Sequence, residues 1–326
     1  MRGSSRIPFP LRAALGVTAL LAATAIAPSF ASSSGVRPGR ARPTASPHEG
    51  GCPVFPAGNA LNEDISRAPV DPKSASYISA IGAGGHLHPD FGTNPSYGIP
   101  YTVVGPHQPR VPIKFTEFSE ESDPGPYPIP PNAPVEGAGE EGDRHVLVLQ
   151  EGTCKLYELY SARRDANGWE AGSGAVFDLH SNALRPDGWT SADAAGLPIF
   201  PLLVRYREVR SGQIDHALRV TVDRSQRGYI HPATHFASGS SDPSLPPMGL
   251  RLRLRASYSL AGYHGEALVV LRALKRYGLI VADNGSSWYI TGAPDPRWND
   301  EDLNQLKRVP GAAFEAVLTG PILHRG

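Results

Sequence analysis

The sequence lacks the short motifs that identify several large enzyme classes. It contains no Gly-x-Ser-x-Gly, no His-Glu-x-x-His and no Gly-x-x-x-x-Gly-Lys segment. These absences argue against an α/β-hydrolase nucleophile elbow, a zincin metal site and the phosphate loop of P-loop NTPases. Neither of the two cysteines lies in a recognisable nucleophile context. We therefore expect neither a cofactor nor a bound metal.

The sequence also lacks an excess of either charge. Lys plus Arg and Asp plus Glu each number 31, so the formal net charge is zero. Removal of an N-terminal leader with three Arg leaves 28 basic and 31 acidic residues, a net charge of −3. A near-neutral chain is not expected to bind nucleic acid, because that binding depends on many Lys and Arg contacts to phosphates.

The first 31 residues have the features of a cleaved signal peptide. Arg2, Arg6 and Arg12 make its start positive, the apolar run Ala13–Ala27 follows, and Ser29-Phe30-Ala31 places small residues at the cleavage positions. This run is shorter than the about 20 residues of a membrane-spanning helix, and no later run is long enough. We expect a secreted protein, extracellular or periplasmic, that is monomeric and has no integral membrane segment after cleavage.

Two further segments follow the signal peptide. Residues 32–51 are rich in Ser, Pro, Arg and Gly, which predicts a flexible tether because such a segment buries little apolar surface. Residues 52–320 form a single predicted domain. Cys52 and Cys154 are the only cysteines, and in an oxidising compartment they are expected to pair as a disulfide.

The predicted domain is mainly β. Gly and Pro number 35 and 33, roughly a fifth of the chain, and they separate short apolar runs. Asp283-Asn284-Gly285 is a hairpin-turn signal. We predict one β-sandwich or jelly-roll-like domain with a few appended helices. The predicted strands are Tyr101–Val104, Val111–Phe118, His145–Leu149, Lys155–Tyr160, Ala175–Leu179, Leu202–Glu208, His216–Val222, Leu250–Ala256, Leu279–Ala282 and Trp288–Thr291, and the predicted helices are Asp71–Ile81, Glu266–Tyr277 and Asn299–Lys307.

A long polar segment, Gly172–Ile199, is the predicted centre of the functional site. Ordered long loops in compact domains are usually functional. Its carboxylates, Asp178 and Asp193, are candidate catalytic groups. Its other candidate ligand contacts are Asn182 and Arg185, which would orient hydroxyls, and Trp189, which would stack on a sugar ring.

Paired carboxylates favour glycoside hydrolysis, in which one acid is held protonated by its surroundings. Asp178 is the preferred acid, because it ends the apolar strand segment Ala-Val-Phe-Asp, which would partly bury it and raise its pKa. Glu121, Asp123 and Asp283 are further candidates. The alternative for each acid is a turn or cap residue.

Two histidines stand at the start of apolar strands. Alternation places His145 on the face of Leu147, and His216 on the face of Leu218, so each would lie at the mouth of a cleft. There an imidazole can transfer protons or bind a metal. The alternative is a structural histidine at the edge of the core. A metal reading would also use His231 and His235.

Gly249–Ala256 alternates Leu with Arg, which places Arg251, Arg253 and Arg255 on one face of a strand. These side chains would form a basic track suited to a polyanionic glycan, or simply a solvated strand face. With such a track the chemistry would be β-elimination from uronic acids, in which a cation neutralises the carboxylate.

Aromatic residues that suit stacking on sugars lie mostly in irregular segments, and about half of them are expected to be core residues. They are Tyr97, Tyr101, Tyr127, Trp169, Trp189 and Trp288.

Four longer motifs resemble a family of secreted bacterial and fungal proteins. They are SDPGPYPIP (Ser122–Pro130), DRHVLVL (Asp143–Leu149), SNALRPDGWTSADAAGLPI (Ser181–Ile199) and ALKRYGLIVADNGSSWYI (Ala273–Ile290). The resemblance extends over most of the chain from Cys52 to Phe314. It implies a single extracellular domain and assigns no activity or catalytic residue.

These observations predict a secreted protein that acts on a polysaccharide or oligosaccharide. A glycoside hydrolase is the first hypothesis, and a polysaccharide lyase acting on a uronic-acid-containing glycan is the second. The third is a non-catalytic glycan-binding or envelope protein of the cell exterior.

Overall fold

The computed structural model describes residues 46–139 and 142–325. The predicted signal peptide (residues 1–31) and residues 32–45 of the predicted tether lie outside the described residues. The end of the tether is structured: β1 (His48–Glu49) pairs with β2 (Cys52–Pro53), and the buried Glu49 forms an ion pair with Arg207. The folded part therefore begins before Cys52.

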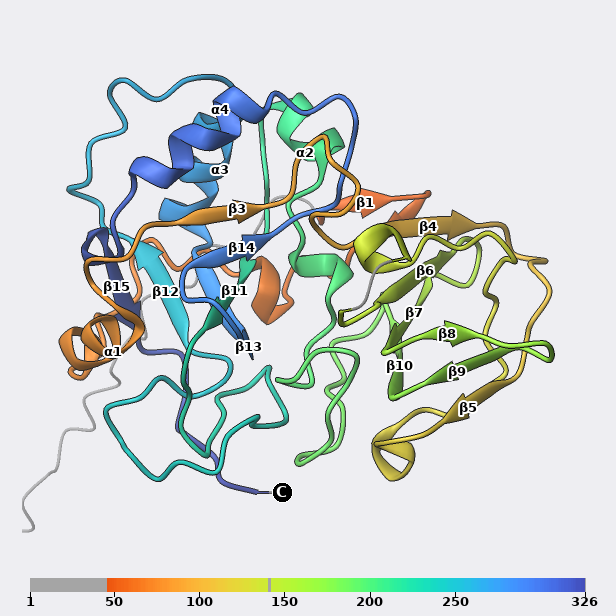
Figure 1. Cartoon of the computed structure of the whole chain (residues 1–326). Helices are drawn as coiled ribbons and strands as arrows, with labels where there is room; N and C mark the ends of the chain where they lie inside the picture. The colour runs from red at the N-terminus through yellow and green to blue at the C-terminus, as the bar shows by residue number, and fades with distance from the viewer. Residues whose placement is uncertain (1–45, 140–141, 326) are drawn as a thin grey trace, which may run out of the picture. The chain divides into compact units, whose positions relative to one another are not determined.

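The described chain is mainly β, as predicted, and its sheets are mixed (Figure 1). The pairs β11–β13, β14–β3, β4–β6 and β5–β9 are parallel. The sandwich-like packing of the sheets stays a prediction. The six-stranded sheet has the order β15 (Phe314–Val317), β12 (Arg251–Leu254), β13 (Leu279–Asn284), β11 (Leu218–Val222), β14 (Tyr289–Thr291), β3 (His88–Asp90); the four-stranded sheet has the order β10 (Ser173–Asp178), β7 (Lys155–Tyr160), β6 (Val146–Gln150), β4 (Tyr101–Val104); the three-stranded sheet has the order β5 (Ile113–Phe115), β9 (Trp169–Ala171), β8 (Arg163–Arg164).

Strand β6 is buried on both faces, which explains its uninterrupted apolar sequence. Val146 and Val148 pack into a smaller core with Tyr127 of the proline-rich segment. Leu147 belongs to the main core, which extends to the six-stranded sheet. The four-stranded sheet is therefore covered on both sides, and polar groups at its ends are held in place by packing.

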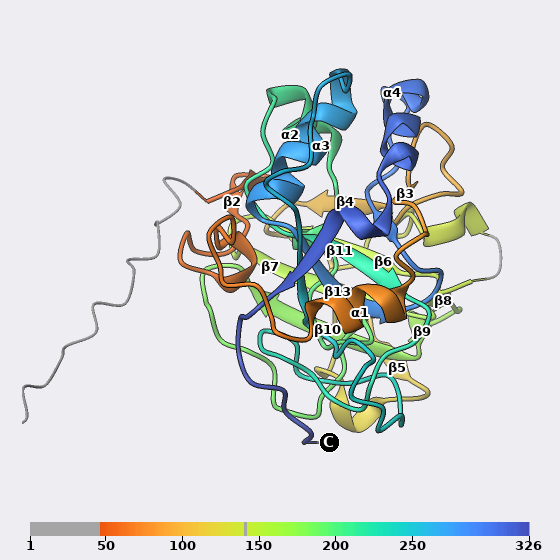
Figure 2. The same cartoon turned by 90° about the vertical axis from the view of Figure 1, so that its left-hand side faces the viewer.

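Four α-helices lie in the described residues: α1 (Ser74–Ile81), α2 (Tyr206–Ser211), α3 (Gly265–Arg276) and α4 (Asp300–Asn304). Helix α1 packs against β15 (Figure 2) and ends at Gly82, whose φ of 108° suits glycine. Three of the four, α1, α3 and α4, were predicted to within a few residues. None of the described helices has the length and apolar character that a membrane span requires.

Two predictions about the elements are wrong. The predicted strand Leu202–Glu208 is instead the end of a 3₁₀ turn (Phe200–Leu202) followed by α2, where the buried Arg205 donates to Phe200 O and Glu208 Oε1. The signal at Asp283 does not connect a hairpin. Strand β11 lies between β13 and β14 in the sheet, parallel to β13 and antiparallel to β14. The two strands that flank the turn therefore do not pair with each other.

The predicted disulfide is confirmed. Cys52 and Cys154 are bonded, with their Cα atoms 5.4 Å apart. The bond links β2 to the turn between β6 and β7.

Candidate functional site

A cavity of about 400 Å³ lies where β7 ends, β10 begins and β13 ends. Its lining combines aromatic rings, hydroxyls, an amide and carboxylates. Tyr160, Ser173, Asp283 and Asn284 lie at strand ends, so the sheets fix their backbone positions, and the other lining residues lie outside the strands. The lining residues are Phe118, Asp143, Tyr160, Ser173, residues 190–194, residues 235–237, Asp283 and Asn284.

One wall of the cavity is a rigid part of the long polar segment. Ser191 Oγ donates to Leu197 O at 2.6 Å, and Thr234 Oγ1 donates to Trp189 O at 2.9 Å. Gly196 has a φ of 72°, and a Cβ at this position would collide with Thr234 Oγ1. The segment therefore turns tightly here and presents residues 190–194 to the cavity.

Arg219 of β11 holds two carboxylates beside the cavity. Its Nε and Nη2 both donate to Asp193 Oδ2, at 3.1 and 2.9 Å, and its Nη1 donates to Thr291 Oγ1 at 3.0 Å. Asp283 Oδ2 lies 3.7 Å from the same Nη2. The side chain of Asp193 is fully buried, whereas that of Asp283 is 23% exposed. Asp283 is thus the acid of this pair that solvent and a ligand can reach.

Their shared position changes the titration of both acids. Burial and the neighbouring Asp193 raise the pKa of Asp283 to about 7, although the charge of Arg219 opposes this. Burial also raises the pKa of Asp193, against the opposing charge of Arg219. A carboxyl that exchanges its proton near neutral pH is suited to general acid–base catalysis.

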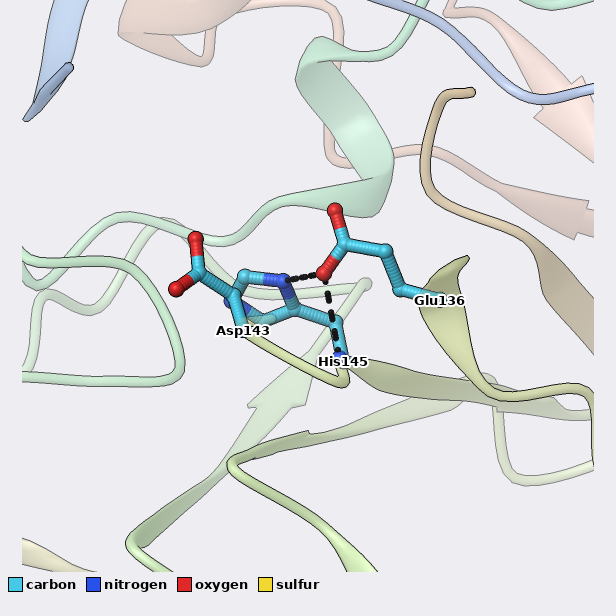
Figure 3. A group of neighbouring side chains, drawn as sticks. All are labelled: Glu136, Asp143 and His145. Atoms are coloured by element: carbon cyan, nitrogen blue, oxygen red, sulfur yellow. Dashed lines mark hydrogen bonds and ion pairs between the residues drawn. The ribbon is translucent and has the colours of Figure 1, made fainter. Parts of the chain in front are cut away.

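His145 directly precedes β6, and its imidazole lies beside the Glu136 carboxylate (Figure 3). Its Nδ1 donates to Glu136 Oε2 at 2.6 Å, and its Nε2 donates to Ala192 O at 2.9 Å. Burial alone would lower its pKa, but the charge and hydrogen bond of Glu136 outweigh burial and raise the pKa to about 9. His145 is therefore an imidazolium that anchors the loop at Ala192.

Glu136, Asp143 and His145 bring one ligand atom each within 4.8 Å of one another, a spacing that a metal ion requires (Figure 3). Both imidazole nitrogens, however, donate to oxygen atoms and so carry protons. A metal ligand must offer a lone pair, so His145 would have to lose its proton and its bond to Glu136. The arrangement suits an ion pair better than a metal centre.

Glu158 of β7 is a further buried carboxyl next to this group. It accepts hydrogen bonds from the backbone N–H groups of Ile199 and Phe200, at 2.8–3.0 Å. Burial raises its pKa to about 7, although these bonds favour the ionised form. It fixes the end of the polar segment rather than the cavity wall.

The structure does not bring all of the predicted catalytic residues together. Asp193 and His145 lie beside the cavity, but Asp178 does not line it. The prediction that β10 buries Asp178 is wrong, because its side chain is exposed and accepts the N–H of His180 at 2.9 Å. His216 is a buried structural residue that bonds to Ala217 O and Glu208.

The side chains predicted to contact the ligand already interact with other residues of the protein. Exposed Asn182 accepts a hydrogen bond from Asn59. Arg185 pairs with Asp123 at 2.5 Å and stacks over Trp189, with 5.7 Å between the guanidinium carbon and the ring centre. Trp189 is half-buried and precedes the lining residue Thr190.

The predicted basic track does not exist. Arg251 and Arg253 are buried, and they donate to the backbone carbonyls of Ala60 and Ile65. Arg253 also pairs with Glu315 at 2.6 Å. Segment 60–68 covers this face of β12, so neither guanidinium is available to a glycan.

The turn signature Asp283-Asn284-Gly285 obscures the role of Asp283, and no motif in the sequence points to Glu158 or Tyr160. A signal was present, since alternation places Glu158 on the same strand face as Leu156, and a carboxyl on an apolar face is unusual. No protein-family model, curated protein or solved structure matches this chain. The cavity itself is therefore the basis for assigning a function.

Proposed function

We propose that the chain is a secreted glycoside hydrolase and that the cavity beside Asp283 is its active site. The observation that carries the proposal is the partly exposed carboxyl of Asp283, whose pKa is raised by burial and by Asp193 to about 7. With this pKa, about half of the molecules carry a protonated Asp283 at neutral pH, and the protonated carboxyl can donate its proton to a glycosidic oxygen.

Asp143 is the second carboxylate of the proposed pair. Its side chain is exposed and lines the cavity. Burial raises the pKa of Tyr160, and the nearby charges of Asp143 and Asp283 raise it further. Asp193 is nearer to Asp283: both acids contact Arg219 Nη2, so their oxygens are no more than 6.6 Å apart, the sum of the two distances. Asp193 is fully buried, however, and its role is to position Arg219.

The remaining lining suits a neutral sugar. Phe118, Tyr160 and Phe236 offer ring surfaces for stacking, and Asn284 Oδ1 is a buried acceptor without a partner among the described residues. None of the described lining residues is Lys or Arg. A uronate would enter a cavity whose lining carries carboxylates and no Lys or Arg to pair with it, which disfavours the lyase hypothesis.

The export of the protein is part of the proposal. It rests on the signal-peptide pattern and on the resemblance to secreted bacterial and fungal proteins.

The proposal is tested by Asp283→Asn in the purified mature protein. We expect cleavage of neutral polysaccharides, measured by new reducing ends, to fall by about 10²–10⁴-fold, the usual contribution of a general acid. Asp178→Asn is the matched control, because it makes the same chemical change at an exposed carboxyl outside the cavity, and it should leave the rate unchanged.

Three results would contradict the proposal. One is full activity in both Asp283→Asn and Asp143→Asn. Another is a product that absorbs in the ultraviolet as an unsaturated uronate, which would indicate a lyase. The third is tight glycan binding without cleavage across the panel, which would indicate a binding protein.

A further inference from the structure

A second cavity, of about 470 Å³, lies beside β3, β14 and α4. Its groups include the stacked rings of His88 and Tyr289, whose centres are 4.1 Å apart, and Tyr97, whose residue surface is 57% exposed. An exposed tyrosine next to a stacked ring pair offers apolar ring faces to a ligand.

The polar groups of this cavity divide into satisfied and unsatisfied ones. Asp300 is satisfied, since it accepts from Thr93 N at 3.0 Å and from Thr93 Oγ1 at 2.5 Å. The carboxylate of Asp90, in contrast, accepts no hydrogen bond from the described residues, although its backbone pairs with β14. Burial raises the pKa of Asp90, which accords with a carboxyl that lacks donors.

The remaining groups carry little net charge. Lys307 is exposed on the cavity wall, and the exposed amide of Asn304 lies beside it. Burial and the charge of Lys307 lower the pKa of His88, so its imidazole is neutral at pH 7. The cavity therefore holds one cation, Lys307, and two carboxylates, Asp90 and Asp300, and Asp300 already accepts a hydrogen bond from the backbone of Thr93.

The wall of the cavity is preformed. Gly92 lies against Asp300, and a Cβ at this position would collide with Asp300 Oδ1. The hydrogen bonds between Thr93 and Asp300 of α4 therefore depend on glycine at position 92. A preformed cavity loses little conformational entropy when a ligand binds.

We propose that this second cavity binds a neutral sugar unit of the polysaccharide that the protein cleaves. A pyranose has an apolar face that stacks on tyrosine, and its hydroxyls both donate and accept hydrogen bonds. They would donate to Asp90 and accept from Lys307 and Asn304. The identity of the polymer as the substrate rests on the proposed function, whereas the binding of the sugar does not.

Binding is tested with the full mature chain carrying Asp283→Asn, so that the probe is not consumed. Calorimetric titration would use neutral hexasaccharides of glucose, mannose, xylose and N-acetylglucosamine. We expect at least one to bind, and we expect Tyr97→Ala and Asp90→Asn each to weaken that binding at least fivefold. Tyr97→Phe keeps the ring and should retain most of the affinity.

A parallel measurement separates this proposal from the proposed function. With Asp283 intact, Tyr97→Ala should leave the cleavage of a short aryl glycoside within twofold of the unmodified protein, while polymer cleavage at low concentration falls at least fivefold. Tyr97 is largely exposed, so its loss should not affect folding, which near-ultraviolet circular dichroism checks.

Two results would overturn the second site. Either no hexasaccharide binds, or the bound hexasaccharide has the same affinity in Tyr97→Ala and Asp90→Asn as in the parent. Binding that depends on Tyr97 without any cleavage of any polymer would uphold this site and refute the hydrolase.

Discussion

At the scale of single residues, the protonation of Asp283 depends on how Arg219 distributes its charge. Two guanidinium nitrogens donate to Asp193 at 2.9 and 3.1 Å, whereas Asp283 lies 3.7 Å away. Asp193 therefore takes most of the counter-charge, so that burial and the charge of Asp193 raise the pKa of Asp283 against a weakened opposition from Arg219.

The first consequence is a pH dependence. If Asp283 donates the proton, kcat/KM should fall as the pH rises through about 7, because the ionised carboxylate cannot act as the acid. A pH–rate profile from pH 4 to 10 measures this alkaline limb. A rate that stays constant to pH 9 would contradict the role of Asp283.

Asp193→Asn tests the distribution of charge directly. A neutral amide leaves the charge of Arg219 free to stabilise ionised Asp283, so the pKa of Asp283 should fall and the alkaline limb should move down by at least one pH unit. The profile of Asp178→Asn should coincide with that of the unmodified protein. An unmoved limb in Asp193→Asn would show that Arg219 does not control Asp283.

Single residues were predicted well where the sequence pattern alone determines their environment. The cysteine count predicted the disulfide, whereas alternation put His145 at the mouth of a cleft and its imidazole is instead buried and bonded to Glu136. Burial of Asp178 was wrong because the last residue of a strand escapes the cover of its neighbours. Arg251 illustrates a different limit, since its partner is a backbone carbonyl of Ala60, 191 positions away.

At the scale of elements, the disulfide closes the β6–β7 turn onto β2. It lies at the end of this antiparallel pair opposite His145 and Tyr160. A double Cys52→Ser, Cys154→Ser variant should lose about 2–4 kcal/mol of unfolding free energy, since a loop of 102 residues is no longer closed in the unfolded chain.

Urea denaturation would measure this loss, and assays in the native baseline should show kcat within twofold of the unmodified protein. A large fall in kcat without loss of secondary structure would mean that the disulfide also shapes the cavity.

Most element types followed from local pattern, with α2 the exception, but element neighbours did not. The periodicity of α3 and the apolar run of β6 predict a helix and a buried strand from nearby residues alone. The pairing of β11 between β13 and β14 brings together residues 61 to 70 positions apart, such as Leu218 with Leu279 and Val220 with Ile290, and no local turn signal reveals it. The cavity lies where these distant pairings meet, so its composition also escaped prediction.

At the scale of the whole molecule, buried ionisable groups link its stability to pH. The folded pKa of His145 is about 9, above its ordinary 6.5, so its stabilising contribution is complete below pH 6.5 and is lost as the pH rises through 9. The folded pKa of Glu158 is about 7, above 4.5, so its contribution is lost between pH 4.5 and 7. Glu136, which has a lowered pKa, titrates below this range.

We therefore expect the free energy of unfolding to fall between pH 5 and 9.5. In His145→Gln it should be lower by about 3 kcal/mol at pH 6, because the change leaves the half-buried Glu136 without its partner. The difference between the two proteins should shrink above pH 9. Urea titrations at pH 6 and 9.5 measure it, and a constant difference would contradict the charged state of His145.

The tryptophans give the molecule an optical property. Trp169, Trp288 and Trp298 are buried, whereas Trp189 is half-buried under the Arg185 guanidinium and directly precedes the cavity wall at Thr190. Three indoles should therefore emit at short wavelength and resist a dissolved quencher. The fluorescence that acrylamide quenches should come from Trp189. A sugar bound in the first cavity should reduce this quenching, so that sugar binding can be followed without a fluorescent label.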